Sequence, residues 1–293
     1  MRIVIFTRLH KAGAAALAMG LAVLGVQAIS AAPAAAATLP PGSVKRVNTL
    51  SPFDVRTAKS FSADCAPGQR VLGGGAFTVG GIHAVITEMQ PVHPATGVDS
   101  FEVSAAADQF GIAGPWGIQV FAFCATVPST MELEIVSHTD LPTSNTVHDA
   151  SLRCPSGKIL VGGGGKIDNG GGQVDLGTGL AGVTTIGAFA KEDADGYAGF
   201  YTDTVYGVCA SSSIINDYSV VRTSNGSTAP NLTETLACPT GMELTGITAE
   251  TDLPGTHLQQ IRPTQANLAI FGTQSSVPPR GTWGLDYAVF CMK

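Results

Sequence analysis

Charged side chains are scarce in this sequence, and the basic ones are the scarcer kind. Lys, Arg, Asp and Glu together make up 13% of the 293 residues. From residue 38 onward, 13 Lys and Arg stand against 22 Asp and Glu, which gives a formal net charge of −9. Because binding to phosphate backbones needs a basic face, this balance argues against a nucleic-acid partner. It also argues against electrostatic docking on anionic lipid.

Long apolar runs are missing beyond the N-terminal segment. No later stretch approaches the roughly 18 apolar residues that a membrane-spanning helix needs. The N-terminal segment has a positive start, an uncharged apolar run over 12–29 and small residues over 31–37. These are the three parts of a secretory signal. We therefore expect cleavage of the signal peptide 1–37 before Thr38 and a secreted, extracellular protein with no membrane span. An uncleaved membrane anchor is the alternative.

Short catalytic motifs are missing as well. The sequence has no G-x-S-x-G nucleophile elbow, no H-E-x-x-H zinc motif and no phosphate-binding P-loop. It has no C-x-x-C pair and no cluster of histidines, so a cysteine zinc site is not expected. These absences favour a non-catalytic protein without a cofactor.

What the sequence does contain is an internal repeat. The segment CAPGQRVLGGG at 65–75 returns as CPSGKILVGGG at 154–164 and, more changed, as CPTGMELTGIT at 238–248. In all three copies a valine lies 18 residues before the first cysteine, and an aromatic residue lies eight before the second. Such fixed offsets indicate internal duplication. The expected organisation is a linker over 38–43 and β repeats over 44–127, 131–213 and 217–293.

Six cysteines, two in each repeat, predict a disulfide framework in an exported protein. Six cysteines allow 15 connectivities, and the repeat selects the one in which every pair stays within its own copy. The predicted pairs, with sequence separations of 59, 55 and 53, are Cys65–Cys124, Cys154–Cys209 and Cys238–Cys291.

The residue periods within each repeat are those of β-strands. Residues 100–104 alternate, and the segment that ends at the second cysteine alternates at first and then becomes apolar on both faces. No apolar stripe of period 3.6 extends over twelve residues. We predict an all-β fold of three pseudo-symmetric, disulfide-stapled repeats, arranged like a β-prism. Three small β-domains in tandem are the alternative.

The glycine triplets have two interpretations. Glycine inside a strand normally marks a bulge or a close approach of backbones. We hypothesise that the glycines at 73–75 and 162–165 approach one another near a pseudo-threefold axis. A wide bulge without an axial role is the other interpretation. Repeat three keeps only Gly246 of its triplet, which puts strict symmetry in doubt.

The Cys-Pro-x-Gly turn, the apolar pair before Gly-Gly-Gly and the closing aromatic strand resemble repeats of uncharacterised secreted actinobacterial proteins. This resemblance covers about residues 44–293. More distantly, the three repeats are similar to the vitelline membrane outer layer family, whose fold is a β-prism. That family has more cysteines, and its remaining motif residues are not found here, so no site residue carries over. Because β-prism lectins bind sugars, the resemblance implies carbohydrate binding by fold analogy alone.

Two sets of residues are candidate binding sites. The repeated aromatic residues would stack on sugar rings if they are exposed, whereas core packing is the alternative. They are Trp116, Tyr201 and Trp283. The acidic segment KEDADG offers oxygen ligands for Ca²⁺, although its spacing is not that of an EF-hand loop. Its candidate ligands are Glu192, Asp193 and Asp195, and a solvated turn is the alternative.

Histidines and carboxylates supply the remaining candidates. His138 and Asp140 are two residues apart on a predicted strand and so share a face, while His148 precedes Asp149. A solvated strand edge is the alternative for both. A glycosidase would need two carboxyl groups about 5 to 9 Å apart. Its candidates are Glu88, Asp99, Glu102, Asp108, Glu192, Asp193 and Asp195.

Together these features predict a secreted, non-catalytic β-repeat protein that binds a surface or a carbohydrate polymer. One alternative is an extracellular polysaccharide-acting enzyme that uses paired carboxylates. Another is a structural, envelope-associated protein with no small ligand.

Overall fold

The computed structural model describes residues 39–40, 42–213, 215, 217–275 and 282–293, which belong to one unit spanning 36–293. The predicted signal over 1–37 lies outside the described residues, as do Thr38 and Pro41 of the predicted linker. Within the described ranges, no helix has the length and apolar character needed to cross a membrane.

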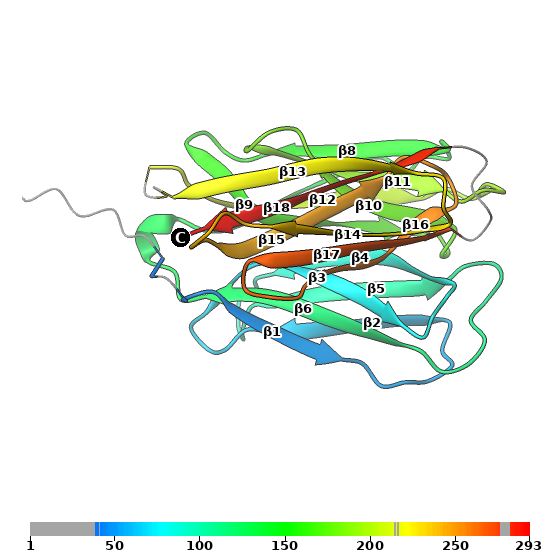
Figure 1. The fold of residues 1–293 in the computed structure, drawn as a ribbon, viewed down its shortest axis with the longest axis horizontal. Helices are drawn as coiled ribbons and strands as arrows, with labels where there is room; N and C mark the ends of the chain where they lie inside the picture. The colour runs from blue at the N-terminus through cyan, green and yellow to red at the C-terminus, as the bar shows by residue number, and fades with distance from the viewer. Residues whose placement is uncertain (1–38, 41, 214, 216, 276–281) are drawn as a thin grey trace, which may run out of the picture. The chain divides into compact units, whose positions relative to one another are not determined.

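The described chain is built from β-strands, with six strands in each repeat (Figure 1). The strands of repeat one are β1 (Lys45–Leu50), β2 (Ala58–Asp64), β3 (Arg70–Val79), β4 (Ala84–Val92), β5 (Ser100–Ala107) and β6 (Gly117–Ala125). A short 3₁₀ helix, η1 (Ser129–Met131), leads to β7 (Glu134–Thr139), β8 (Val147–Arg153), β9 (Lys158–Asp168), β10 (Val174–Leu180), β11 (Thr185–Glu192) and β12 (Thr202–Ser211). Repeat three contains β13 (Tyr218–Ser227), β14 (Asn231–Ala237), β15 (Glu243–Thr251), β16 (Thr256–Pro263), β17 (Leu268–Ser275) and β18 (Trp283–Met292). The all-β prediction is confirmed.

Every repeat pairs its strands in the same way. The first, sixth and third strands form one three-stranded group, and the second, fifth and fourth strands form another. Groups from different repeats then join into two six-stranded sheets. Sheet I has the order β1-β6-β3-β16-β17-β14, and sheet II has the order β2-β5-β4-β9-β12-β7. The remaining groups, β10-β11-β8 and β13-β18-β15, are separate three-stranded sheets.

This sharing of sheets decides between the two predicted architectures. Three separate domains in tandem are wrong, because sheets I and II each combine strands of two repeats. The β-prism prediction is met only in part, because the hydrogen-bond ladders define four sheets instead of three faces. At the place where a third six-stranded sheet would form, Gly177 of β10 lies against Glu250 of β15 without a ladder between the two strands.

One glycine position differs between the paired junctions and the unpaired one. A Cβ on Gly75 of β3 would overlap the carbonyl of Ile261, and a Cβ on Gly164 of β9 would overlap the carbonyl of Met89. The bare backbone at these two positions therefore lets β16 and β4 come close enough to pair. Thr248 occupies the equivalent position of β15, two residues after Gly246. A side chain thus stands where the two paired junctions have bare backbone.

The first glycine of each triplet brings the three repeats together. A Cβ on Gly73 would lie 2.6 Å from Thr245 O, and a Cβ on Gly246 would lie 2.6 Å from Gly162 Cα. A Cβ on Gly162 would overlap the carbonyl of Leu72 and so completes the cycle. Each of these glycines also follows a register shift in its strand. The axial contact and the bulge, which the sequence left as alternatives, therefore occur together.

Disulfides tie the two strand groups of each repeat to each other. In every copy the cysteine that follows the second strand bonds to the cysteine near the end of the sixth strand. The bonds, with Cα–Cα distances of 5.6, 5.8 and 5.6 Å, are Cys65–Cys124, Cys154–Cys209 and Cys238–Cys291. All three predicted pairs are confirmed.

Candidate functional site

The repeated aromatic residues lie in the core. Trp116, Tyr201 and Trp283 are 0%, 0% and 1% exposed. The indole N–H or phenol O–H of each ring donates a hydrogen bond of 2.6 to 2.9 Å to a backbone carbonyl. The accepting carbonyls lie between the first two strands of each repeat and belong to Arg56, Asn145 and Ala229. The buried rings fasten these segments onto the interior and offer no face to a ligand. The condition for stacking on sugars, an exposed ring, is therefore not met, and the alternative of core packing holds.

The predicted Ca²⁺ ligands do not converge on one point. Asp193 points into a narrow pocket, where burial and the neighbouring Asp195 raise its pKa to about 6. Asp195 instead accepts a hydrogen bond of 2.7 Å from Gln109. Glu192 is buried, and its Oε1 has no hydrogen-bond partner among the described residues. In the described part of the chain these three carboxylates do not form a metal-type group.

The pocket that holds Asp193 lies where the three repeats meet. It is lined by the second residue of each fourth strand, namely Val85, Asp175 and His257, together with Asp108. Burial raises the pKa of Asp175 and lowers the pKa of His257, so it favours the neutral form of both. The space between these side chains does not admit a water molecule. A closed pocket with buried titratable groups affects the stability of the fold and offers no space to a ligand.

Two histidines pair with aspartates at one end of repeat two. His138 Nε2 lies 3.0 Å from Asp140 Oδ1, as their spacing on one strand predicts. His148 does not pair with Asp149. Its Nδ1 lies 2.9 Å from Oδ1 of Asp203, which is 55 residues away in the chain.

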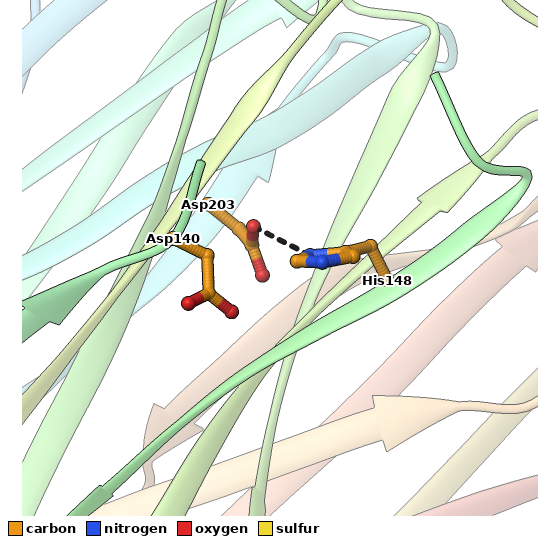
Figure 2. Close-up of side chains that lie close together, drawn as sticks. All are labelled: Asp140, His148 and Asp203. Carbon is orange, nitrogen blue, oxygen red and sulfur yellow. Dashed lines mark hydrogen bonds and ion pairs between the residues drawn. The ribbon is translucent and has the colours of Figure 1, made fainter. Parts of the chain in front are cut away.

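Asp140, His148 and Asp203 form the group within the described ranges whose donor atoms could hold a metal ion. One donor atom from each residue lies within 4.8 Å of the other two. Figure 2 shows the Asp203 carboxylate between Asp140 and the imidazole of His148. Asp203 is fully buried, and its Oδ2 has no hydrogen-bond partner among the described residues. Asp140 and His148 are half-buried, so the group is accessible from one side.

Sequence reasoning missed Asp203 because its partners lie on other strands. A signal was nevertheless present. The strand that ends at the second cysteine is mostly apolar, and six residues before this cysteine repeat one has Ile118 and repeat three has Leu285. Repeat two has the charged Asp203 at this position and so departs from the apolar pattern. Its partners could not be predicted, because they lie on strands whose neighbours the sequence does not reveal.

A surface groove crosses sheet II from repeat one to repeat two. Gln90 and Pro91 of β4 form one side, and Ile135 and Ser137 of β7 form the other. Tyr206 of β12 lies between them, and the groove has a volume of about 440 Å³. Arg70, His93 and Glu134 add polar groups at its edge. The groove thus combines an aromatic ring with several donors and acceptors.

Sheet I has a groove at the equivalent position. Arg262 and Pro263 of β16 and the following Thr264 face Arg46 and Asn48 of β1, with Phe121 of β6 between them. Its volume is about 310 Å³. The two grooves correspond residue by residue. Pro263 occupies the same position of its strand as Pro91, and Phe121, like Tyr206, lies three residues before the second cysteine.

A polar band continues across sheet II beside the first groove. Burial raises the pKa of Tyr206, while the nearby ammonium of Lys166 opposes this shift. Ser104 donates a hydrogen bond of 2.6 Å to Glu88. Burial raises the pKa of Glu102, and the adjacent Glu88 raises it further. Of the carboxylates considered for a glycosidase, Glu102 on β5 is therefore affected by the charge of Glu88 on the neighbouring β4.

Most of the other carboxylates of that set have structural partners or lie in the closed pocket, and Glu192 is buried with no partner for its Oε1 among the described residues. Asp99 holds Arg70 at 2.9 Å and His93 at 2.7 Å. Asp108 holds His83 at 2.8 Å.

Comparison with known proteins adds no family. No protein-family model matches the chain, and a search of the curated proteins found no match. A functional assignment therefore depends on the grooves and on the Asp140–His148–Asp203 group.

Proposed function

We propose that this chain is an exported, non-catalytic protein that binds a carbohydrate polymer of a cell surface in the grooves of sheets I and II. The observation that supports this function is the recurrence of the groove at equivalent positions on two sheets. A groove formed only by imperfect packing has no reason to keep its proline and its aromatic residue in two different copies.

The chemistry of the groove on sheet II suits a polyhydroxyl ligand. A half-buried tyrosine presents an apolar ring and a polar hydroxyl, which fits a sugar ring and its hydroxyl groups. Gln90 and Arg70 carry planar groups that bond two neighbouring oxygens, and Ser137 and Glu134 add acceptors. The groove of sheet I offers Arg262 and Asn48 in the same places relative to Phe121.

Two similar grooves on one molecule favour a polymer over a single sugar. When two weak sites engage one chain, the second contact is intramolecular, and the overall affinity exceeds that of either site. The groove of sheet I is the smaller one, at about 310 Å³ against about 440 Å³, and its Phe121 is only 7% exposed. We therefore assign the stronger single contact to Tyr206.

We also infer that the architecture is a distorted β-prism with one opened face. The identical strand order of the three repeats and the cyclic contact of Gly73, Gly162 and Gly246 support a pseudo-threefold axis. The opening between β10 and β15 is the departure from it. Export is supported by the three disulfides, which persist in oxidising compartments, and by the signal-like N-terminal sequence. The likeness to secreted actinobacterial repeats and to the vitelline membrane outer layer family stays a prediction.

The test uses the oxidised, exported protein with a panel of insoluble polysaccharides and purified cell walls. Bound protein is measured in the pellet, and released sugar is measured in the supernatant. We expect binding without sugar release, together with competition by soluble fragments of the bound polymer. Tyr206→Ala should weaken binding about tenfold, since the loss of one aromatic contact is worth roughly 1.4 kcal/mol.

The matched control is Phe200→Ala, which removes a ring that is 66% exposed and lies outside both grooves. It should bind like the unchanged protein. Equal binding by Tyr206→Ala and the unchanged protein would exclude the groove of sheet II. Absence of any binding would leave a structural, envelope-associated role as the better explanation.

One observation favours a second candidate, a polysaccharide-acting enzyme. Glu102 is a partly buried carboxylate whose pKa is raised by burial and by the charge of the neighbouring Glu88, as the pKa of a general acid would be. Sugar release that is lost in Glu102→Gln and in Glu88→Gln would replace the non-catalytic proposal.

A further inference from the structure

We propose that Asp140, His148 and Asp203 bind one divalent transition-metal ion of the Zn²⁺ type. This site is separate from the two grooves and does not depend on carbohydrate binding. It lies in repeat two alone, where the end of β7, the start of β8 and the start of β12 come together (Figure 2).

The first argument is geometric. Three donor atoms within 4.8 Å of one another fit around a single ion, because Zn²⁺ binds nitrogen and oxygen at about 2.0 to 2.2 Å. The backbone fixes two of the three residues, since Asp140 N donates to Asp203 O at 3.1 Å. His148 faces them from the second position of β8, with its side chain 24% exposed. The open side leaves room for a fourth ligand, as in zinc sites with three protein ligands.

The second argument is electrostatic. Asp203 is a carboxylate with 0% side-chain exposure, and one of its oxygens has no partner among the described residues. Among the described ion pairs, Asp203 pairs only with His148, and Asp140 pairs only with His138. The buried Glu192 adds a further acid, because it acts with Asp203 on the nearby Tyr201. A neutral imidazole leaves this buried negative charge uncompensated, and a divalent cation compensates it.

The third argument comes from the equivalent position of repeat one. The second residue of β2 is Lys59, which corresponds to His148. Its ammonium is nearly buried and lies 2.9 Å from Pro52 O, 2.5 Å from Trp116 O and 2.9 Å from Asp54. Repeat one thus places its own cation at this corner of the fold. Repeat two has acidic groups and a histidine there, so it needs a cation from solution.

Repeat three shows that the fold does not require these polar residues. Its second β14 residue is Leu232, and the position of Asp203 is occupied by Leu285, which pairs across strands with Asn225. The same backbone arrangement therefore forms around two leucines and an asparagine. The Asp140–His148–Asp203 set is an addition to the scaffold, as expected of a ligand site.

The donor set selects the class of metal. Ca²⁺ and Mg²⁺ prefer oxygen ligands alone, whereas an imidazole with two carboxylates suits Zn²⁺ and its neighbours among the divalent transition metals. All six cysteines are in disulfides and cannot compete as thiolates. The proton that His148 Nδ1 shares with Asp203 Oδ1 would move to Nε2 of the same neutral imidazole, which frees Nδ1 for the ion without net proton release. His138 would orient Asp140 through its contact of 3.0 Å.

The experiment is calorimetric titration of tag-free, chelator-treated protein with ZnCl₂, CaCl₂ and MgCl₂. Titrations in two buffers of different ionisation enthalpy measure proton release, and native mass spectrometry gives the stoichiometry. We expect one Zn²⁺ per chain with well under one proton released per ion, because the imidazole only changes tautomer, and much weaker binding of Ca²⁺ and Mg²⁺. His138→Gln should weaken Zn²⁺ binding by about tenfold, the effect expected for a residue that orients a ligand.

The decisive variant carries Asp140→Asn, His148→Leu and Asp203→Leu together, which reproduces the residues of repeat three. We expect it to fold and to lose Zn²⁺ affinity at least 100-fold. If it does not fold, Asp140→Asn and His148→Gln are tested singly and should each weaken binding more than His138→Gln does. His93→Gln is the control, because His93 also lies 2.7 Å from an aspartate but belongs to no three-ligand group among the described residues.

Zn²⁺ binding that is unchanged in the decisive variant, or in both single variants, would overturn the proposal. So would the absence of Zn²⁺ binding at micromolar concentrations, or binding that is lost in His93→Gln. A preference for Ca²⁺ over Zn²⁺ would contradict the assigned class of metal. None of these results bears on the grooves, so the two proposals can fail separately.

Discussion

At the scale of single residues, the absence of a side chain determines how closely the three repeats approach. Gly73, Gly162 and Gly246 lie in a cycle in which any Cβ would meet the backbone of the next repeat. Backbone atoms cannot turn aside as a flexible side chain can, so an added methyl group must push two strands apart. The glycine requirement is therefore steric and comes from the partner repeat.

Gly162→Ala tests this requirement. We expect a loss of about 3 kcal/mol in the free energy of unfolding, at the upper end of the range for overpacking a core. Guanidinium unfolding of the oxidised protein measures it. Gly226→Ala is the control, because its nearest heavy atom is the flexible Thr282 Cγ2 at 3.3 Å, and it should change stability by less than about 1 kcal/mol. Similar losses in the two variants would contradict an axial role for Gly162.

Residues differ in how well the sequence predicts their role. The disulfide partners could be predicted because the repeat aligns Cys154 with its counterparts and so leaves one consistent pairing. The partner of His148 could not, since Asp203 lies on a strand whose position depends on sheet pairing. The burial of Trp116 was equally ambiguous, because an aromatic residue at the start of an apolar strand suits a core and a sugar platform alike.

At the scale of strands and sheets, the junctions between repeats differ in how they are closed. Gly75 and Gly164 permit short ladders to β16 and β4, whereas β15 has Thr248 at this position and no ladder to β10. Glu250 of β15 lies against Gly177 of β10 in the unpaired junction. Burial, and secondly the charge of Asp286, raise the pKa of this glutamate to about 7.

Glu250 makes the unpaired junction sensitive to pH. Its pKa in the folded protein lies above the usual value near 4.3, so the folded state holds the proton more tightly. The associated stability is fully present below about pH 4 and is lost as the pH rises through 7. We expect amides of β10 and β15 to be less protected from hydrogen exchange at pH 8 than at pH 5.5, after correction for intrinsic rates. Glu250→Gln should remove most of this difference.

Lys191 and Arg222 favour the charged form of Glu250, and Asp286 opposes it. Asp286→Asn should therefore lower the pH at which protection is lost, without abolishing the effect. If the difference in protection persists in Glu250→Gln, another group must titrate. The next candidates are Asp175 and His257 in the pocket where the three repeats meet.

Strand existence was predictable from alternation and from the turn after each first cysteine, but sheet membership was not. Alternation with a period of two shows which residues of a strand share a face, but it does not show which strand lies next to it in the sheet. The loss of glycines in repeat three indicated broken symmetry. The sequence could not show which junction lacks a ladder, because the strand opposite Thr248 belongs to another repeat. The grooves were missed for the same reason, because Gln90 and Ser137 come from different repeats.

At the scale of the whole molecule, the repeats are folded into one another. Sheet I combines repeats one and three, and sheet II combines repeats one and two. Each repeat therefore contributes strands to a sheet that it shares with another repeat. Unfolding one repeat would expose the pairing edge and the buried face of its neighbours, which costs more than unfolding an independent domain.

We therefore expect the oxidised protein to unfold in one cooperative transition. Scanning calorimetry measures it, and the size of the van 't Hoff enthalpy decides the cooperative unit. One unit over residues 36–293 corresponds to roughly 180 kcal/mol near 60 °C, whereas a single repeat corresponds to about 60 kcal/mol. The excised segment 44–127 should lack a cooperative transition, since β3 and β4 lose their partners β16 and β9. Three resolved transitions, or an excised repeat that unfolds cooperatively, would contradict the coupling that the shared sheets imply.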